Sequence, residues 1–368
     1  MALSVIVVGG GILGTATAFR LVQAGARVTL LEAGLLGQGA SAVGFGWLNA
    51  NDKPPIAYHQ LNTTGMREYA RLRRELGAAS WLHETGSVEW LRATARPVPL
   101  RDKVAHLREW GYAVELLPVR ELRRLEPDLV PPSDLEEFAF FPDEAYVDLL
   151  SLIGVLLGVA RETGATIRTQ TKVVGLTRHG DRVVGVETER GERLPADLVV
   201  CCGGRRSNEL ARMVGFDLPM ASNTGMTVVL APSATRLRGL FHDGELNIRP
   251  DGAGRVMIGH DPRFDDQVSP GEPVPPTVTA ALRDCAAKVL PGLAGVPVET
   301  ARVTVRPIPG DSFPIVGPMP EVGGLYLLTT HSGATLGPLL GRMVAAEIMD
   351  GVIDPRLATF RPDRVMVG

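Results

Sequence analysis

The sequence predicts an α/β protein in which both ends of the chain build a Rossmann-like nucleotide-binding domain and a β-rich second domain is inserted between them. The chain opens with a strand, a glycine turn, a helix and a second strand, over residues 4–31. It closes with a strand, a glycine turn and a helix, over residues 324–351. Short strand-like segments dominate the middle. A length of 368 residues also favours two domains.

The opening unit has the local signals of a buried parallel strand followed by a helix. Residues 4–8 (SVIVV) are apolar and β-branched, which is typical of a central strand covered on both faces. A helix is expected from about residue 12 to residue 24, with Gly25 as its stop signal. Residues 27–31 form the next strand.

The turn between this strand and helix carries the spacing G-x-G-x-x-G at Gly9, Gly11 and Gly14. The first glycine permits a tight turn, the second lets the backbone approach a pyrophosphate, and the third lets the helix pack on the strand. The helix N-terminus favours phosphate, and Glu32 can accept hydrogen bonds from ribose hydroxyls. The contacts predicted at this end are Gly9, Gly11, Ile12, Leu13, Gly14, Glu32 and Ala33.

The segment 34–53 departs from a plain nicotinamide-binding domain, which would continue with another βα unit. It is rich in small and polar residues, which suits a chain lying along an elongated cofactor. Ser41, Asn49 and Asn51 are its candidate hydrogen-bonding residues. An ordinary surface loop is the alternative, and the glycine spacing alone does not separate NAD from FAD.

The middle of the chain is a series of further helices and strands. Helices are predicted over 60–78 and 146–163, one or two helices broken at Gly111 over 100–126, and a helix ending near residue 290 after a Pro-rich loop at 269–277. Strands are predicted over 86–91, 165–177, 181–188, 197–202, 225–230 and 255–259.

Composition narrows the class of protein. A net charge of −3 and the lack of a basic stripe argue against a nucleic-acid partner. Three cysteines are too few and too poorly spaced for a zinc site or a disulfide framework, and Cys201 and Cys202 are expected in a buried strand. There is no signal-peptide pattern and no apolar run of ~18 residues, so we expect a cytoplasmic protein without a membrane span.

Longer motifs carry a resemblance that covers nearly the whole chain. They are "VVGGGILG…LLEAG", "GASAVGFG", "TKVVGL", "DLVVCCGGRRSNEL" and "VRPIPGDSFPIVG…LYLLTTHSGATLGPLLGRMVAAEIMDG". The chain resembles the superfamily of FAD-dependent D-amino-acid oxidases, glycine oxidases and sarcosine oxidases. The resemblance implies a glutathione-reductase-type FAD-binding domain from residues 1–85, 145–217 and 303–368. Residues 86–144 and 218–302 would form an inserted α+β substrate domain on a largely antiparallel sheet.

The resemblance also implies where the cofactor lies. Val173 would meet the adenine, and Gly203 and Gly204 would close over the dinucleotide. The turn made by Gly333, Ala334, Thr335, Leu336 and Gly337 would sit at the pyrimidine end of the flavin, where N–H dipoles favour the negative charge of the reduced ring. The alternative is a helix start filled by its own cap. No cysteine follows "RP" where sarcosine oxidases attach their flavin, so the FAD is expected to be non-covalent.

The implied reaction is oxidation of a C–N bond in an amino acid or related amine. Hydride passes to the flavin, the imine hydrolyses, and the electrons pass to O2 or another acceptor. Arg306 matches the arginine that binds substrate carboxylate in the amino-acid and glycine oxidases, with pairing to Asp311 as the structural alternative. His331 and Lys53 are the other catalytic candidates, and His59, His260 and Trp47 are weaker ones.

Several positions depart from the family pattern. The second arginine of glycine oxidase is replaced by Gly333, a substrate-domain tyrosine by Asn247, and the oxygen-activating lysine of sarcosine oxidase by Met257. Arg249 is left as a weaker polar contact beside Asn247. The substrate therefore need not be glycine or sarcosine, and the resemblance does not imply fast reaction with oxygen.

Other functions stay open from the sequence. They are a dehydrogenase that avoids oxygen, a tailoring enzyme that oxidises a larger amine scaffold in a biosynthetic route, a non-catalytic FAD-binding protein and a pyridine-nucleotide dehydrogenase. The oligomeric state is not predicted.

Overall fold

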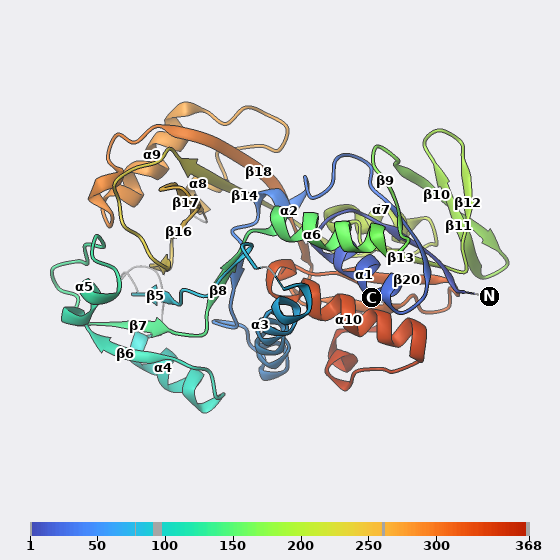
Figure 1. The fold of residues 1–368 in the computed structure, drawn as a ribbon, viewed down its shortest axis with the longest axis horizontal. Coiled ribbons are helices and arrows are strands. Elements are labelled where there is room, and N and C mark those ends of the chain that lie inside the picture. Colours follow the sequence, from blue (N-terminus) through green and yellow to red (C-terminus); the bar gives the residue numbers. More distant parts are fainter. Residues whose placement is uncertain (1, 78, 91–97, 260–261, 366–368) are drawn as a thin grey trace.

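Two lobes make up the computed structural model, which describes residues 2–77, 79–90, 98–259 and 262–365. The N-terminal strands and the C-terminal helix share one lobe, drawn on the right in Figure 1, and the middle of the chain forms most of the other. The two ends of the chain therefore fold together, as the repeated strand–turn–helix pattern predicts.

A six-stranded sheet is the centre of the first lobe. Its strand order is β19-β20-β13-β1-β2-β9, and only the edge pair β19–β20 is antiparallel. The strands are β1 (Ser4–Val8), β2 (Arg27–Leu31), β9 (Thr166–Arg168), β13 (Leu198–Cys201), β19 (Ile315–Pro318) and β20 (Leu325–Thr329). Because β1 and β13 are covered on both faces, their residues are apolar without alternation, and Cys201 and Cys202 are buried as expected.

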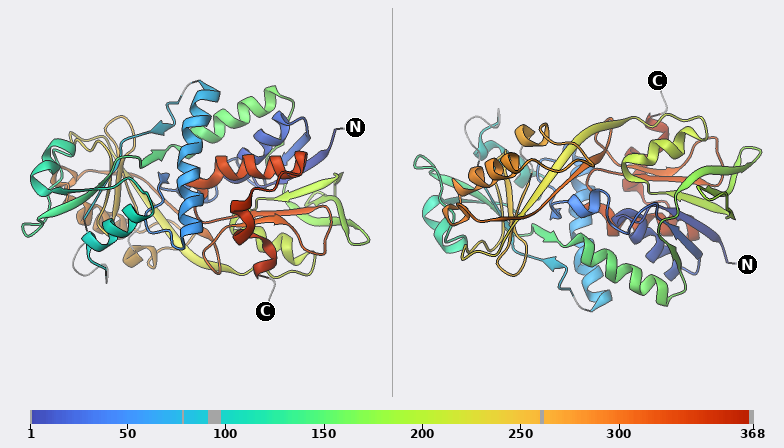
Figure 2. Two further views of the ribbon diagram at one scale, coloured as in Figure 1. Left: turned by 90° about the horizontal axis from the view of Figure 1, so that it is seen from below. Right: turned by 90° about the horizontal axis from the view of Figure 1, so that it is seen from above.

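The four longest described helices of the first lobe are α1 (Ile12–Gln23), α3 (Ile56–Leu76), α6 (Leu149–Glu162) and α10 (Gly333–Asp350). α1 packs against α10, and α3 crosses one end of α10 in the left view of Figure 2. A side chain at Gly341 of α10 would place its Cβ 2.7 Å from the backbone of Ala16, so glycine is needed where the two helices cross. Beside this layer lies a small antiparallel sheet of β10 (Val173–His179), β11 (Arg182–Thr188) and β12 (Arg193–Pro195).

An eight-stranded sheet builds the second lobe, in the order β18-β14-β17-β16-β15-β5-β7-β6. All its pairs are antiparallel except β15–β5. Its strands are β5 (Ser87–Glu89), β6 (Glu115–Pro118), β7 (Glu137–Phe141), β14 (Met220–Leu230), β15 (Leu240–His242), β16 (Asn247–Pro250), β17 (Val256–Gly259) and β18 (Val298–Pro309). The predicted fold class, a Rossmann-like domain with an inserted, largely antiparallel α+β domain, is confirmed.

The remaining elements refine the sequence-based assignments. In the region 100–126, where helices are expected, α4 (Leu100–Glu109) ends before Gly111, β6 occupies residues 115–118, and α5 (Leu122–Leu125) is one turn. Helix is wrong for β6 because pairing with β7 overrides local propensity. α9 (Pro276–Ala287) covers the large sheet, and β3 (Trp47–Leu48), β4 (Leu82–His83) and β8 (Ala145–Val147) form a small sheet near the junction of the lobes.

β14 and β18 are the long strands that run from the second lobe toward the middle of the molecule in Figure 1. Their pairing is continuous from Met220–Pro309 to Leu230–Val298 apart from one irregularity. The boundary expected between residues 302 and 303 falls inside β18. This strand carries side chains of the substrate-side sheet, Arg306 among them, toward the first lobe.

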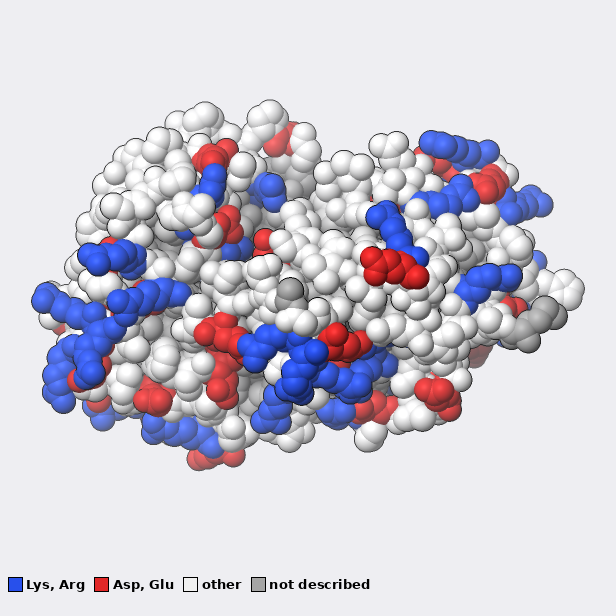
Figure 3. Space-filling model, in the orientation of Figure 1, with Lys and Arg blue, Asp and Glu red and all other residues white. Residues whose placement is uncertain are grey.

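The surface charges are mixed in sign, as the modest net charge suggests. On the face drawn in Figure 3, acidic and basic side chains lie next to one another in several places, including the lower edge. Within the described ranges, the helices all fall short of the length and apolar character needed to cross a membrane.

Candidate active site

A cavity of about 650 Å³ runs between the two lobes. One end is formed by the glycine turn after β1 and by the ends of β2 and β13, and the other by β14, β16, β18 and the start of α10. Of the predicted site residues, it is lined by Gly9, Gly11, Ile12, Leu13, Glu32, Ala33, Ser41, Lys53, Val173, Gly203, Gly204, Arg306, His331, Gly333, Ala334 and Thr335. The structure therefore brings together positions that lie more than 300 residues apart in the chain.

The glycine turn leaves room for a ligand on its cavity side. Gly9 has φ +110°, and a Cβ there would lie 2.4 Å from the carbonyl oxygen of Cys202. A Cβ on Gly14 would lie 1.9 Å from the carbonyl oxygen of Gly9, so Gly14 serves helix packing and does not line the cavity. A Cβ on Gly11 would meet only the Ser41 hydroxyl, at 3.3 Å, so the space beside Gly11 is otherwise open, and a pyrophosphate could approach the backbone there.

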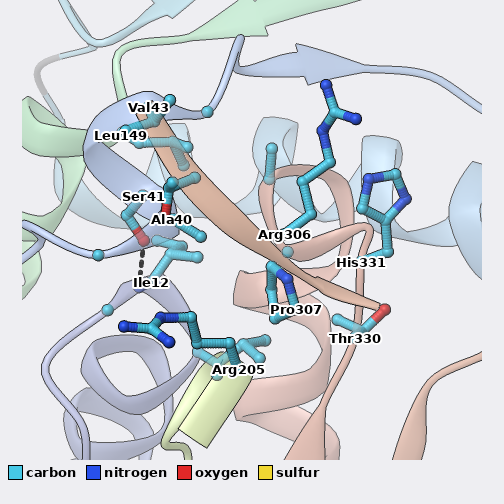
Figure 4. Close-up of a pocket in the computed structure, with 18 of the residues that line it drawn as sticks. Ile12, Ala40, Ser41, Val43, Leu149, Arg205, Arg306, Pro307, Thr330 and His331 are labelled. Atoms are coloured by element: carbon cyan, nitrogen blue, oxygen red, sulfur yellow. Dashed lines mark hydrogen bonds between the residues drawn. The ribbon is translucent and has the colours of Figure 1, made fainter. Parts of the chain in front are cut away.

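Polar side chains hold this turn in shape. The Ser41 hydroxyl accepts a hydrogen bond from the Ile12 N–H at 3.1 Å, drawn as a dashed line in Figure 4. The Glu32 carboxylate accepts the N–H groups of Gly10 and Gly34, each at 2.7 Å. Gly11, the cap residue of α1, has no side chain of its own, and the start of the helix lines the cavity through Gly11, Ile12 and Leu13.

The start of α10 is the corresponding feature at the other end of the cavity. In the part of the chain that the structure describes, its first turn has no side-chain cap, since the Ser332 hydroxyl bonds instead to Tyr58 at 2.7 Å and to the Lys53 ammonium at 3.2 Å. The cap that would have filled this turn is thus absent, and Gly333, Ala334 and Thr335 line the cavity. Leu336 is fully buried and Gly337 packs against Ile12, so these two predicted contacts lie behind the cavity wall.

Lys53 brings a positive charge to this turn. Burial lowers the pKa of its ammonium from 10.5 to about 8, while the negative charge of Glu144 opposes that shift. Its Nζ also lies 5.8 Å from the centre of the Tyr58 ring. Near pH 8, Lys53 therefore changes charge inside the cavity.

Arg306 lines the cavity from β18, and its partner differs from the expected structural alternative. Its Nη2 donates to Asp265 Oδ2 at 2.6 Å, and its Nη1 donates to Asn223 Oδ1 at 2.8 Å. Asp311 instead pairs with Arg364. In Figure 4 the Arg306 side chain rises beside His331, on the side of the cavity away from Ile12 and Ser41.

The histidine candidates separate clearly. His331 lines the cavity. His59 is outside its lining: it is 1% exposed, its Nδ1 bonds to the Ala50 carbonyl at 2.9 Å, and its ring lies against Trp110 and Tyr112. His260 lies outside the described residues.

The remaining polar and packing candidates divide between the cavity lining and the protein interior. Asn247 and Trp47 line the cavity, whereas Arg249 and Met257 are outside its lining. Arg249 is buried, pairs with Asp251 at 2.9 Å and lies 4.8 Å from the centre of the Tyr146 ring. The expected polar contact from Arg249 is therefore replaced by a structural ion pair.

Sequence reasoning missed Glu144, which lies behind the cavity and is 1% exposed. Its carboxylate accepts the Trp47 indole N–H at 2.7 Å and bonds to the hydroxyls of Ser87 and Tyr112 at 2.6 and 2.7 Å. Burial raises the pKa of the Glu144 carboxyl to about 7. It was missed because its three partners lie 32 to 97 residues away and leave no local pattern.

Among the predicted residues, those on the two helix starts and the glycine turn suit an elongated dinucleotide. The open space over Gly11 fits a pyrophosphate, and the uncapped start of α10 fits the electron-rich edge of a flavin. The two-lobed fold and the cavity together fit the class of FAD-dependent oxidoreductases.

Comparison with known proteins identifies the family. Residues 4–347 match the family described as DAO, FAD dependent oxidoreductase, and the chain belongs to it. The chain is 30% identical to a glycine oxidase of Pseudomonas aeruginosa, covering 95% of this chain and 96% of that protein. The prediction of an FAD-dependent enzyme of the amine and amino-acid oxidoreductase family is confirmed.

Solved structures agree with the fold. A glycine oxidase from Geobacillus kaustophilus superposes with a TM-score of 0.85 at 24% identity, covering 98% of both chains. An L-proline dehydrogenase from P. horikoshii gives a TM-score of 0.85 at 20% identity, covering 99% of this chain and 98% of that one. At sequence identities this low, these matches show a shared fold and nothing further.

Proposed function

We propose that this enzyme oxidises the C–N bond of an amino acid or a related amine to an imine, which water then hydrolyses. The observation that carries the proposal is the single cavity that joins the glycine turn and the start of α10 to a polar compartment on the eight-stranded sheet. A flavin held by the first two features would present its ring to a substrate in the third. The glycine oxidase relative supports an amino acid or amine as the substrate class.

Bound FAD supplies the hydride acceptor. The N–H groups of Gly333, Ala334 and Thr335 would lend positive potential to a flavin ring held at this turn, together with the Lys53 ammonium. The same charge disfavours a second cation in the cavity, so it lowers the pKa of a bound substrate amine and favours its neutral form. Trp47, held by Glu144, forms a fixed wall of the compartment.

The electrons then pass to O2 or to another acceptor. The position of the sarcosine oxidase lysine is taken by Met257, which is buried and outside the cavity lining. This supports slow reaction with oxygen and an acceptor other than O2. Comparing reoxidation of the reduced enzyme in air and with an artificial quinone distinguishes the two acceptors.

We propose that the FAD is held without a covalent bond. The described cysteines lie away from the ring end: Cys201 is buried, Cys202 lies beneath the glycine turn beside Gly14, and Cys285 lies on α9. Acid precipitation should release all of the flavin into the supernatant. Yellow colour retained in the pellet would contradict this proposal.

Anaerobic mixing tests the reaction itself. Holoenzyme mixed without oxygen with a panel of primary and secondary amines and amino acids should lose its absorption near 450 nm with at least one of them. Alcohols of matched skeleton serve as controls, because they lack the C–N bond. If every amine in a broad panel leaves the flavin oxidised, the proposed function is wrong and a non-catalytic role for the FAD is favoured.

A further inference from the structure

The arginine expected to bind a substrate carboxylate already has a carboxylate partner within the protein. Asp265 Oδ2 lies 2.6 Å from Arg306 Nη2, and the two side chains are 6% and 19% exposed. A bond this short, in a setting this sheltered, is a charge-assisted hydrogen bond. The positive charge of Arg306 is thereby largely balanced before any substrate enters.

Asp265 is fixed in place from its other side. It ends the short helix α8 (Pro262–Asp265), and its Oδ1 accepts the Met226 N–H of β14 at 2.9 Å. The two oxygens of one carboxylate therefore tie β14 to β18. Asp265 cannot swing away from Arg306 without also breaking the bond to the Met226 backbone.

The sheet itself holds the arginine in this pose. The guanidinium lies over Gly225, where a Cβ would fall 2.5 Å from Arg306 Nε and 2.9 Å from Cζ. Asn223, the cross-strand neighbour of Arg306, accepts from Nη1 at 2.8 Å. Gly225, Asn223 and Asp265 together form a seat for the guanidinium.

A free amino acid would have to compete for this seat. If its carboxylate displaced Asp265, the Asp265 carboxylate would be left buried without a charge partner, which weakens binding on the order of 100-fold or more. If it bound beside Asp265, two carboxylates would share one guanidinium and repel each other. Lys53 offers no equivalent site, because its ammonium bonds to Ser332 at the start of α10.

We propose that Asp265 is a specificity-determining residue that neutralises Arg306, so that the site favours amines whose carboxylate is absent or masked as an amide or ester over free amino acids. The Arg306–Asp265 pair then offers N–H donors and carboxylate oxygens to a neutral group such as an amide. This inference rests on the proposed amine oxidation and narrows its substrate class. It replaces the role of carboxylate clamp expected for Arg306.

The first test uses the wild-type holoenzyme with matched pairs of substrates. Glycine with glycinamide, alanine with alaninamide and proline with prolinamide differ in the carboxylate alone, at a pH where each amine ionises to a known extent. For the pairs that bleach the flavin, the second-order rate constant corrected to the neutral amine should be on the order of 100-fold higher for the amide. Equal or higher rates for the free amino acids would overturn the proposal.

The second test uses Asp265→Asn, which retains the side-chain shape and an acceptor for the Met226 N–H but removes the charge. Benzoate and benzamide are titrated into the holoenzyme and followed by the change in the flavin spectrum. In the variant, benzoate should bind at least 10-fold more tightly than to wild type, while benzamide changes less than 3-fold. Unchanged or weaker benzoate binding, with flavin content and circular dichroism as in wild type, would contradict the inference.

Two further variants control this result. Asp311→Asn removes a carboxylate that pairs with Arg364 away from the cavity, and it should leave benzoate binding as in wild type. Adding Arg306→Ala to Asp265→Asn should abolish the gain. A gain that survives in this double variant, or that Lys53→Met abolishes instead, would overturn the assignment to the Arg306–Asp265 pair.

Failure of the proposed function is distinguishable from failure of this inference. If no amine or amide reduces the flavin, amine oxidation is wrong, yet the redox-inert benzoate and benzamide pair still reports on Asp265. If amino acids reduce the flavin well and Arg306→Ala alone stops them, amine oxidation stands and the role of Asp265 is refuted. If Asp265→Asn does not fold, the rate constants of the wild-type holoenzyme for each amino acid and its amide still test the proposed role of Asp265.

Discussion

Substitution of Gly11 by alanine tests whether the glycine turn approaches the pyrophosphate as closely as the structure indicates. Gly11 has an extended backbone, φ −77° and ψ −177°, which alanine adopts without strain. Its Cβ would meet only the Ser41 hydroxyl, at 3.3 Å. The variant without cofactor should therefore unfold at nearly the wild-type free energy.

The cost should appear in FAD binding, because the new methyl group projects into the cavity where the phosphates pass. Losing one charge-assisted hydrogen bond from the turn costs about 1.5–3 kcal/mol, which corresponds to roughly 10- to 150-fold in Kd. Titration of apoprotein with FAD, followed by quenching of flavin fluorescence, measures this directly. Binding within 3-fold of wild type would refute the proposed path of the cofactor.

Gly25→Ala is the matched control within the same unit. Gly25 has φ +90°, and no atom lies within 4 Å of a Cβ built there, so the substitution introduces backbone strain without blocking the cavity. It should cost about 1–2 kcal/mol of stability and leave the FAD Kd of the folded protein unchanged. The opposite pattern in the two variants would show that the glycine turn serves folding rather than cofactor binding.

Two further predictions concern buried ionisable groups. Because the pKa of Lys53 is lowered to about 8, its positive charge is lost as pH rises through that value. The rate of anaerobic flavin reduction by a substrate, corrected for substrate ionisation, should therefore fall by roughly 10-fold across this pH range. The Lys53→Met variant should reduce its flavin slowly at every pH, without this step. Because the pKa of Glu144 is raised from 4.5 to about 7, the folded protein keeps a proton that the unfolded chain loses, so its stabilising contribution is complete below pH 4.5 and is lost as pH rises through 7. The free energy of unfolding, measured with urea at several pH values, should lose about 3 kcal/mol from this group over that window. Glu144→Gln should flatten the slope, and an unchanged slope would show that Glu144 is ionised throughout.

The parts of the fold that the sequence predicted are those with local signals. The unit from β1 to β2 shows a buried apolar strand, a glycine turn and a helix stop within 30 residues, and the C-terminal turn before α10 repeats the same signals. Helix was wrong for β6 because its strand conformation depends on pairing with β7, whose partner residues run from Phe140, opposite Glu115, to Glu137, opposite Pro118. Edge strands of this kind leave weak periodicity in a short segment.

In the candidate site, too, residues with a local sequence pattern were predicted and residues that depend on long-range contacts were not. The cofactor residues follow a chain pattern, and most of them line the cavity. The partners of Arg306 and the network of Glu144 could not be predicted, because Asp265 lies 41 residues from Arg306 and Trp47 lies 97 residues from Glu144. Arg249 shows the converse: it lies two residues after Asn247 on β16, and alternation along a strand predicts the same face for both. Its guanidinium nevertheless donates to the Phe45 carbonyl and pairs with Asp251, contacts that the local sequence does not predict.

The most direct test of the central claim is the stoichiometry of a single anaerobic turnover. Holoenzyme mixed with an excess of an amine that bleaches it should yield one carbonyl product and one released amine or ammonia for each flavin reduced, both quantified after acid quench. The account predicts this ratio of one to one to one. Flavin reduction without cleavage of the C–N bond would contradict it.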